Sequence, residues 1–221
     1  MIGYMTIQTN LDDLITALAA NGYAVIDQAM PDEAITQLRN EACKLKRMGL
    51  MQSASTGKNS SAHILSALRG DFTHWLDTTI SKPSSNQIDS MIYIKFMESL
   101  RQLLNQTLFL GLFDFETHYA IYAAGTGYSK HLDQFQQNNL MQANISARKI
   151  SSILYLNQNW KTHDGGQLRL YLEAEHLEAK KNIDIEPISG RLVIFLSDRF
   201  WHEVLPAKRE RISLTGWFRL R

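Results

Sequence analysis

The chain has 221 residues, of which 44% are hydrophobic and 20% charged, and its formal net charge is +1. This size and composition are ordinary for a globular protein that can bury a real core. The near-neutral charge gives no support for a nucleic-acid partner. Cys43 is the only cysteine, which excludes an internal disulfide and favours a reducing compartment. We therefore expect a cytoplasmic protein without a signal peptide or a membrane span.

Helical patterns dominate the first half of the chain. Asn10 is a suitable cap for a short amphipathic helix that would stop at Gly22, because glycine tolerates the left-handed conformation of a helix end. The segment 23–27 reads as a strand, and helical spacing of apolar residues returns over 31–49 and 88–113. Small polar residues indicate two loops between these elements, at 53–61 and 81–90.

After residue 114 the pattern changes to short strands separated by turn residues. The expected strands cover 116–122, 148–157, 166–171, 183–187, 190–196 and 210–220. The sequence thus predicts one domain over 1–221, in which 1–113 is mainly helical support and 114–221 is an antiparallel β-sandwich or barrel.

Three potential metal ligands fall in this β part. His131 and Asp133 are two residues apart, so on an extended segment both side chains point to the same side. His202 would have to come from a neighbouring strand. Two imidazoles and one carboxylate suit one face of an octahedral Fe(II), with the opposite face open. Zinc fits less well, because no cysteine is nearby and structural zinc prefers four protein ligands. The tripeptide His-Leu-Asp alone is a weak signal.

An arginine nine positions after His202 adds a second signal. In the strand ERISLTGWF, one face carries Arg211 with two hydroxyls and an indole, whereas the other face is apolar. An inward-facing arginine needs an anion, because an unpaired buried charge is very costly. A dicarboxylic ligand would supply that anion. The competing interpretation is that Arg211 is an exposed edge residue balanced by Glu210.

Six segments of the chain together resemble a known family. They read YAAGTGYSKHLD, ILYLN, GGQLRL, IEP, RLVIFLSDRFWHEVLP and RISLTGW. In this order and with these gaps they resemble the 2-oxoglutarate- and Fe(II)-dependent prolyl 4-hydroxylases, especially the subgroup of the animal hypoxia-inducible-factor hydroxylases and their bacterial relatives. The resemblance covers roughly residues 50 to 220.

The resemblance implies an α+β protein with a double-stranded β-helix (jelly-roll) core, supported by N-terminal and central helices. It also implies Fe(II), 2-oxoglutarate as co-substrate and ascorbate as reductant. The positions that match catalytic and metal-binding residues are His131, Asp133, His202 and Arg211. Those that match co-substrate contacts are Arg211, Tyr155, Thr215, Tyr122 and Leu168. Those that match the prolyl-substrate side are Arg69, Asp71, Trp75, Arg148 and Trp217.

The implied activity is hydroxylation of a prolyl residue in a protein substrate, with release of succinate and CO2. Bacterial relatives are associated with elongation factor Tu, which makes that protein a candidate substrate by analogy. Asp133 favours hydroxylation over halogenation, since a chloride-accepting site would have a small residue there. The alternatives are an iron oxygenase acting on a nucleobase, lipid or free amino acid, a non-catalytic oxygen- or metal-sensing module, and a structural β-sandwich. Oligomeric state is left open.

Some features depart from the family pattern. Ala123 and Ala124 stand where relatives have a Pro-Gly turn that is one residue longer, and the segment 134–147 is longer than in the animal enzymes. The loop 53–61 is a candidate lid over bound peptide. His118 shares its strand face with Tyr122, but we interpret it as a packed histidine rather than as part of the site.

Overall fold

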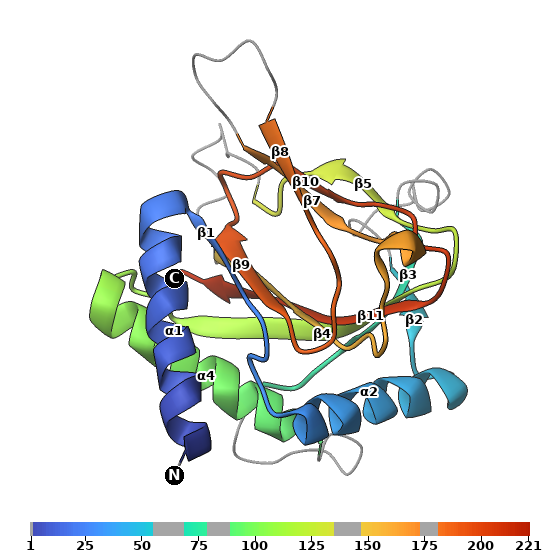
Figure 1. Cartoon of the computed structure of the whole chain (residues 1–221), viewed down its shortest axis with the longest axis horizontal. Helices are drawn as coiled ribbons and strands as arrows, with labels where there is room; N and C mark the ends of the chain where they lie inside the picture. The colour runs from blue at the N-terminus through green and yellow to red at the C-terminus, as the bar shows by residue number, and fades with distance from the viewer. Residues whose placement is uncertain (1, 55–68, 79–88, 135–146, 173–180) are drawn as a thin grey trace.

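The computed structural model describes residues 2–54, 69–78, 89–134, 147–172 and 181–221 (Figure 1). The helices are α1 (Ile2–Asn21), α2 (Asp32–Arg47), α4 (Ser90–Leu108) and the short 3-10 helix η2 (Thr162–Asp164). The strands are β1 (Tyr23–Ile26), β2 (Gln52–Ser53), β3 (Asp71–Trp75), β4 (Asp114–Tyr122), β5 (Tyr128–His131), β6 (Arg148–Tyr155), β7 (Leu168–Leu172), β8 (Lys181–Ile185), β9 (Leu192–Leu196), β10 (His202–Val204) and β11 (Arg211–Arg219).

The strands form two antiparallel sheets that face each other. The larger sheet has seven strands in the order β1-β9-β6-β11-β4-β3-β2, and the smaller has four in the order β5-β10-β7-β8. Most neighbouring strands are not consecutive in sequence, as expected for a jelly-roll in which the chain passes back and forth between the sheets; the exceptions are β2-β3, β3-β4 and β7-β8. In Figure 1 the small sheet lies on one side of the large sheet, and α2 and α4 lie on the other.

Successive side chains of the central strands point to opposite faces of the large sheet and so form two separate cores. In β11, Ile212, Leu214 and Phe218 belong to a core shared with the helices. The intervening side chains of β11 face the small sheet, where Tyr122 and Tyr155 of the neighbouring strands lie in the second core. The expected split of this strand into an apolar face and a polar face is confirmed. The polar face is the one that points between the sheets.

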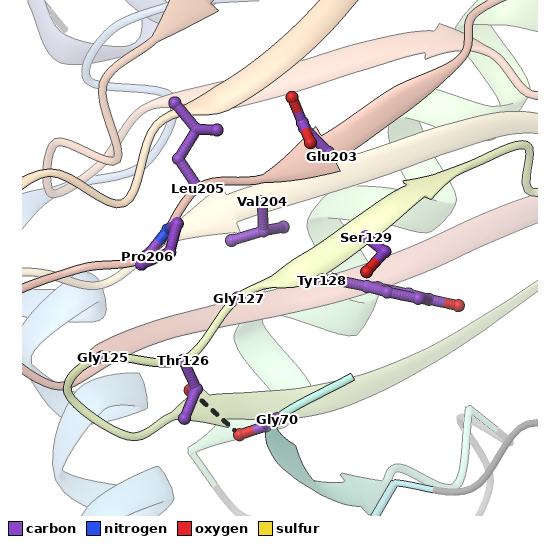
Figure 2. A pocket seen from close by; sticks show the side chains of 10 residues that line it. All are labelled: Gly70, Gly125, Thr126, Gly127, Tyr128, Ser129, Glu203, Val204, Leu205 and Pro206. Carbon is purple, nitrogen blue, oxygen red and sulfur yellow. Dashed lines mark hydrogen bonds between the residues drawn. The ribbon is translucent and has the colours of Figure 1, made fainter. Parts of the chain in front are cut away.

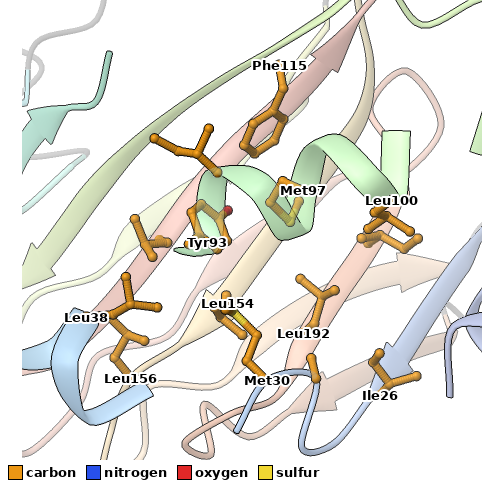
Figure 3. Packing of buried hydrophobic residues seen from close by; sticks show 14 of the residues in the cluster. Ile26, Met30, Leu38, Tyr93, Met97, Leu100, Phe115, Leu154, Leu156 and Leu192 are labelled. Atoms are coloured by element: carbon orange, nitrogen blue, oxygen red, sulfur yellow. The ribbon is translucent and has the colours of Figure 1, made fainter. Parts of the chain in front are cut away.

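The core between helices and sheet is built from large aliphatic and aromatic side chains. Figure 3 shows Tyr93, Met97 and Leu100 of α4 lying against Leu154 and Leu192 of the sheet. All five side chains are fully buried. Burying a side chain of this size stabilises the fold by about 1.5–3 kcal/mol each, so this core holds the large sheet in place as a rigid wall of the site.

The helix boundaries agree with the sequence in part. Gly22 (φ 79°) and Gly49 (φ 68°) end the first two helices in the left-handed conformation, as expected. The cap at Asn10 was wrong, because α1 begins at Ile2 and passes through that residue. The third helix was expected over 88–113 but ends at Leu108, where Phe109 takes a left-handed conformation (φ 55°).

Each of the six strands expected after residue 114 is present, with ends that shift by up to two residues. The strands β2, β3, β5 and β10 were not among those listed from the sequence, although His131 was expected on an extended segment and His202 on a strand beside it. Most of the expected loops 53–61 and 81–90 and most of the segment 134–147 lie outside the described residues. None of the helices in the described part is both long and apolar enough to span a membrane.

Glu41 of α2 gives a test of the helix–sheet core. Its side chain is buried and accepts hydrogen bonds from Ser90 and Tyr119. Burial raises the pKa of Glu41 above its usual 4.5, although the hydrogen bond from Ser90 opposes the shift. The folded state therefore holds this proton more tightly than the unfolded state. The associated stability is complete below pH 4.5 and is lost as the pH rises through the folded-state pKa.

We therefore expect Glu41→Gln to raise the unfolding midpoint at pH 7 by about 2 to 4 °C, the shift given by ~1 kcal/mol in a chain of this size. Glutamine removes the buried charge and keeps both contacts when the hydroxyl that faces its NH2 group accepts rather than donates. At pH 4 the two proteins should unfold at nearly the same temperature. Thermal denaturation followed by circular dichroism at both pH values measures the difference, and an equal gain at pH 4 would contradict the assignment to the buried charge.

Candidate metal and co-substrate site

His131, Asp133 and His202 come together at the edge of the small sheet. His131 is the last residue of β5 and pairs directly with His202, the first residue of β10. Asp133 lies in the bend just after β5 rather than on the strand. One ligand atom from each of the three side chains lies within 4.8 Å of the others. They are the one such group of three in the part of the chain that the structure describes.

Backbone contacts fix the two imidazoles in the form that binds a metal. His131 Nδ1 lies 2.8 Å from the Ser129 carbonyl, and His202 Nδ1 lies 3.0 Å from the Phe200 carbonyl. A carbonyl only accepts hydrogen bonds, so both Nδ1 atoms carry the proton. This leaves Nε2 of each ring as the atom for a metal, and the Asp133 oxygens lie 3.6 Å from His131 Nε2 and 3.5 Å from His202 Nε2. This arrangement favours metal binding.

The Asp133 carboxylate is held in its charged form. Burial would raise its pKa, but His202 and His131 and a hydrogen bond from Ser151 lower it well below the usual 3.8. Burial lowers the pKa of His202, even though Asp133 opposes the shift. Both groups are thus in the state that a metal needs, an ionised carboxylate and a neutral imidazole.

Two serines support the carboxylate from behind. The Ser151 hydroxyl lies 2.6 Å from Asp133 Oδ2 and 2.9 Å from the Ser197 hydroxyl. Both serines are fully buried. Outer partners of this kind orient a ligand and tune its affinity for the metal.

We expect Ser151→Ala to weaken metal binding about 10- to 100-fold, because Asp133 loses its hydrogen-bond donor. The adjacent Ser152 offers a matched control, since its hydroxyl points to the other face of β6 and donates to the Gly216 carbonyl at 3.2 Å. Titration with Mn(II) followed by calorimetry measures both variants. Equal losses in the two variants would mean that a general loss of packing, rather than the contact with Asp133, is responsible.

Arg211 lies in the second part of the site. It is 1% exposed, and its Nε donates to the Gly166 carbonyl at 3.0 Å while Nη2 lies 3.4 Å from the Tyr155 hydroxyl. The guanidinium also lies 5.2 Å from the Tyr122 ring centre and 4.9 Å from that of Tyr155. Within the described residues, no carboxylate lies within ion-pair distance of Arg211.

The alternative of an exposed Arg211 balanced by Glu210 is therefore wrong. Glu210 instead pairs with Lys46 of α2. A buried guanidinium without an internal anion is suited to an incoming carboxylate, which it can bind with two parallel hydrogen bonds.

The turn before β7 shapes the surroundings of Arg211. Gly166 has φ 72°, and a Cβ at this position would lie 2.9 Å from the Ala207 side chain and 3.3 Å from Arg211 Cδ. Gly166 therefore allows its own carbonyl to approach the guanidinium. Trp160 beside it donates from Nε1 to the Gly165 carbonyl at 3.0 Å, which fixes the turn.

The other expected co-substrate residues lie around this arginine. Tyr122, Tyr155 and Leu168 are buried in the same inner core. Burial raises the pKa of both tyrosines, so they are neutral phenols that can donate hydrogen bonds. Thr215 is half-buried on the inner face of β11, two residues past Ser213, whose hydroxyl lies 3.4 Å from its own. Their specific contacts with a co-substrate stay predictions.

The residues expected on the substrate side form two groups. In the first, Arg69 donates to both oxygens of Asp71, at 2.6 and 3.0 Å, and lies 4.8 Å from the Tyr128 ring centre. Tyr128 in turn stacks on His131, with ring centres 3.7 Å apart. This buried ion pair thereby supports a potential metal ligand through an aromatic ring.

The second group is an aromatic cluster beside the metal ligands. Trp75 is half exposed and lies 4.6 Å from His118, and His118 lies 5.5 Å from Trp217. Arg148 stacks over Trp217 at 3.6 Å and donates to Glu116 at 2.8 Å. The guanidinium of Arg148 thus already has an acidic partner, and its role toward a substrate stays a prediction.

A cavity of about 380 Å³ lies next to this centre (Figure 2). It is lined by Gly70, Gly125, Thr126, Gly127, Tyr128, Ser129, Glu203, Val204, Leu205 and Pro206. None of the three potential metal ligands or Arg211 lines it, although Tyr128 borders both the cavity and His131. The cavity is a neighbour of the site rather than the site itself.

Sequence reasoning missed Ser151, Ser197 and Tyr128, and it set His118 aside. Ser151 could have been found, because it shares its strand face with Tyr155 and a serine on an inward face needs a polar partner. The contact of Tyr128 with His131 depends on the irregular pairing of β5 with β10, which no local pattern reveals.

The comparisons with known proteins agree with this geometry. Residues 117–219 match the family model of the 2OG-Fe(II) oxygenase superfamily. The chain is 28% identical over 213 residues to a hypoxia-inducible factor prolyl hydroxylase of Caenorhabditis elegans, covering 94% of this chain and 28% of that protein. It is 30% identical over 216 residues to Egl nine homolog 1 of Homo sapiens, covering 94% of this chain and 46% of that protein. The chain thus spans less than half the length of these two relatives.

The match with one solved structure covers both chains almost completely. The prolyl-4-hydroxylase of Pseudomonas putida has a TM-score of 0.77 and 37% sequence identity, covering 96% of this chain and 99% of that chain. The expected double-stranded β-helix core is thereby confirmed, and iron and 2-oxoglutarate are the partners of this superfamily. The chain therefore belongs to the 2OG-Fe(II) oxygenase superfamily and, within it, to the prolyl hydroxylases.

Proposed function

We propose that this protein is a prolyl 4-hydroxylase, which uses O2 and 2-oxoglutarate to hydroxylate a prolyl residue of a protein substrate and releases succinate and CO2. The proposal is carried by Arg211, a buried cation without an anionic partner in the described part of the chain, together with the group of two imidazoles and one carboxylate that could hold a metal. The names of the related Pseudomonas putida and animal proteins support proline as the target.

The protein's own residues do three things in this reaction. His131, Asp133 and His202 would hold Fe(II) while leaving positions open for other ligands. Arg211 and the phenol of Tyr155 would bind the far carboxylate of 2-oxoglutarate and select its length. Buried Tyr122 and Leu168 would exclude water from the reacting end. Iron and 2-oxoglutarate, when bound, supply the oxidant that inserts one oxygen atom into a C–H bond.

The substrate is proposed to be a cytosolic protein with an accessible proline, and elongation factor Tu is the candidate taken from the family resemblance. Location in the cytoplasm is supported by the single cysteine, Cys43. Ascorbate is proposed as the reductant that keeps the iron ferrous. A formal net charge of +1 supports a protein rather than a nucleic acid as the partner.

Mass spectrometry of elongation factor Tu and other candidate proteins tests the proposal after incubation with Fe(II), ascorbate and 2-oxoglutarate. The expected result is the gain of one oxygen atom on a proline, with one succinate released per hydroxylation. Succinate release without modified proline would instead favour an iron oxygenase acting on another substrate. A protein that binds iron but never releases succinate would be a non-catalytic sensing module.

A further inference from the structure

His118 is buried in the aromatic cluster with Trp75 and Trp217 and has no hydrogen-bond partner among the described residues. Its side chain is 1% exposed, and neither ring nitrogen has a partner within the described part of the chain. The indole Nε1 of Trp217, whose ring lies 5.5 Å from His118, is also buried without a partner. Buried polar atoms are nearly always hydrogen-bonded in native proteins. Two such residues in one cluster therefore point to a polar partner that binds there.

The strand register places His118 on the wall between the two expected halves of the site. It pairs with Thr215 of β11 on one side and with Trp75 of β3 on the other. Like Tyr122, it points toward the space between the sheets. The ring of Trp75 lies 4.6 Å from it and is half exposed, so only this partly exposed indole separates one side of the cluster from solvent.

The chemistry of the ring defines what it can bind. Burial lowers the pKa of His118 to about 3, and the nearby charges of Arg69 and Arg148 add to the effect. The imidazole is therefore neutral near pH 7, with one N–H donor and one acceptor nitrogen. The indole of Trp217 adds a second donor and no acceptor. The cluster as a whole offers more donors than acceptors.

A peptide that contains proline has the complementary composition. Proline lacks a backbone N–H, so the segment around it presents carbonyl acceptors in excess of donors. Resting on the proposed function, we propose that His118 is a substrate-binding residue whose N–H, together with that of Trp217, donates to the backbone carbonyls next to the target proline. The acceptor nitrogen of His118 is then free for the next backbone N–H of the peptide.

The test compares His118→Leu with His118→Gln in the protein loaded with Mn(II) and 2-oxoglutarate. Leucine fills the space without polar atoms, whereas glutamine keeps one donor and one acceptor. We expect His118→Leu to weaken binding of a proline peptide about 5- to 10-fold, the effect of one neutral hydrogen bond. His118→Gln should stay within about 3-fold of the wild-type protein. Calorimetry measures peptide binding without any turnover.

A change in the peptide identifies the bonded atom. Replacing the carbonyl before proline by a thiocarbonyl, a weaker acceptor, should weaken binding to the wild-type protein by a similar factor. The same change should have little effect on His118→Leu, since the two losses concern one hydrogen bond and are not additive. Independent losses of affinity in the two proteins would overturn the assigned contact.

Stability separates binding from packing. His118→Leu removes two unpartnered polar atoms from a buried site, so its unfolding midpoint without peptide should rise by about 2 to 4 °C. His74→Leu is the matched control, because His74 lies on the opposite face of β3 and binds the Leu50 carbonyl at 2.8 Å. It should lower the midpoint and leave peptide binding unchanged.

The possible failures can be told apart. If the wild-type protein binds 2-oxoglutarate with Mn(II) but binds no proline peptide, both the proposed function and the role of His118 are overturned. If the wild-type protein binds peptide and His118→Leu binds it equally well, only the role of His118 is overturned.

Discussion

His131→Ala is expected to abolish both metal binding and the release of succinate. The substitution removes one of three ligands from a site that, among the described residues, offers no fourth side chain to replace it. Loss of a supporting outer residue usually weakens metal affinity 10- to 100-fold, so loss of a ligand should weaken it at least ~100-fold. Calorimetry with Mn(II) and a succinate assay with Fe(II) measure the two effects.

The control for this variant is His74→Ala, which removes the same side chain from the outer face of β3. It should bind Mn(II) as the wild-type protein does. Unchanged metal affinity in His131→Ala would show that Asp133 and His202 bind the ion with other partners, and the assignment of the centre would then be wrong.

The expected meeting of His131, Asp133 and His202 is found in the structure because of how the strands are connected. His131 and Asp133 are close in sequence, at the end of β5 and in the bend just after it. His202 is distant, but the antiparallel pairing of β10 with β5 puts it directly opposite His131. The family resemblance supplied this long-range pairing, which the local pattern of residues does not contain.

The inward direction of the Arg211 side chain could be predicted from the alternation of polar and apolar residues along its strand. In β11 the apolar residues face the helices, so the odd-numbered polar residues must face the small sheet. What alternation could not give was the absence of an internal anion, because that depends on which side chains the neighbouring turns bring close. The carbonyl of Gly166 reaches Arg211 where an acidic side chain could have stood.

The incorrect predictions concern places where tertiary contacts override local signals. Asn10 is a good helix cap in isolation, yet an asparagine inside a helix costs only about 0.7 kcal/mol relative to alanine, and α1 continues through it. The third helix ends early because Asn105 binds both backbone groups of Leu112, which turns the chain back toward β4. Neither effect is visible in the periodicity of apolar residues.

His118 shows a related limit. Its position on an inward strand face was readable from the sequence, but a histidine there is usually hydrogen-bonded. Only the structure shows that both nitrogens lack partners in the described part of the chain. The proposed role of His118 depends on this lack of hydrogen-bond partners, and a sequence pattern does not reveal it.

Arg211→Met is expected to weaken binding of 2-oxoglutarate about 30-fold or more, equivalent to at least ~2 kcal/mol. Methionine fills much of the same volume but cannot bind a carboxylate. The unfolding midpoint of the protein without co-substrate should stay the same or rise, because the substitution also removes a buried cation that has no anionic partner among the described residues. Calorimetry with Mn(II) and thermal denaturation measure the two quantities. Arg209→Met is the control, since Arg209 is part exposed and pairs with Asp164.

A truncated co-substrate tests whether the distal carboxylate is the anion that Arg211 binds. A 2-oxo acid of the same length that lacks this carboxylate should bind the wild-type protein much more weakly than 2-oxoglutarate. Arg211→Met should bind the two acids with similar affinity, because the charge and its partner belong to one interaction and their losses are not additive. If Arg211→Met still prefers 2-oxoglutarate by the wild-type factor, another group binds the carboxylate. The buried guanidinium would then have a structural role through Gly166 and Tyr155.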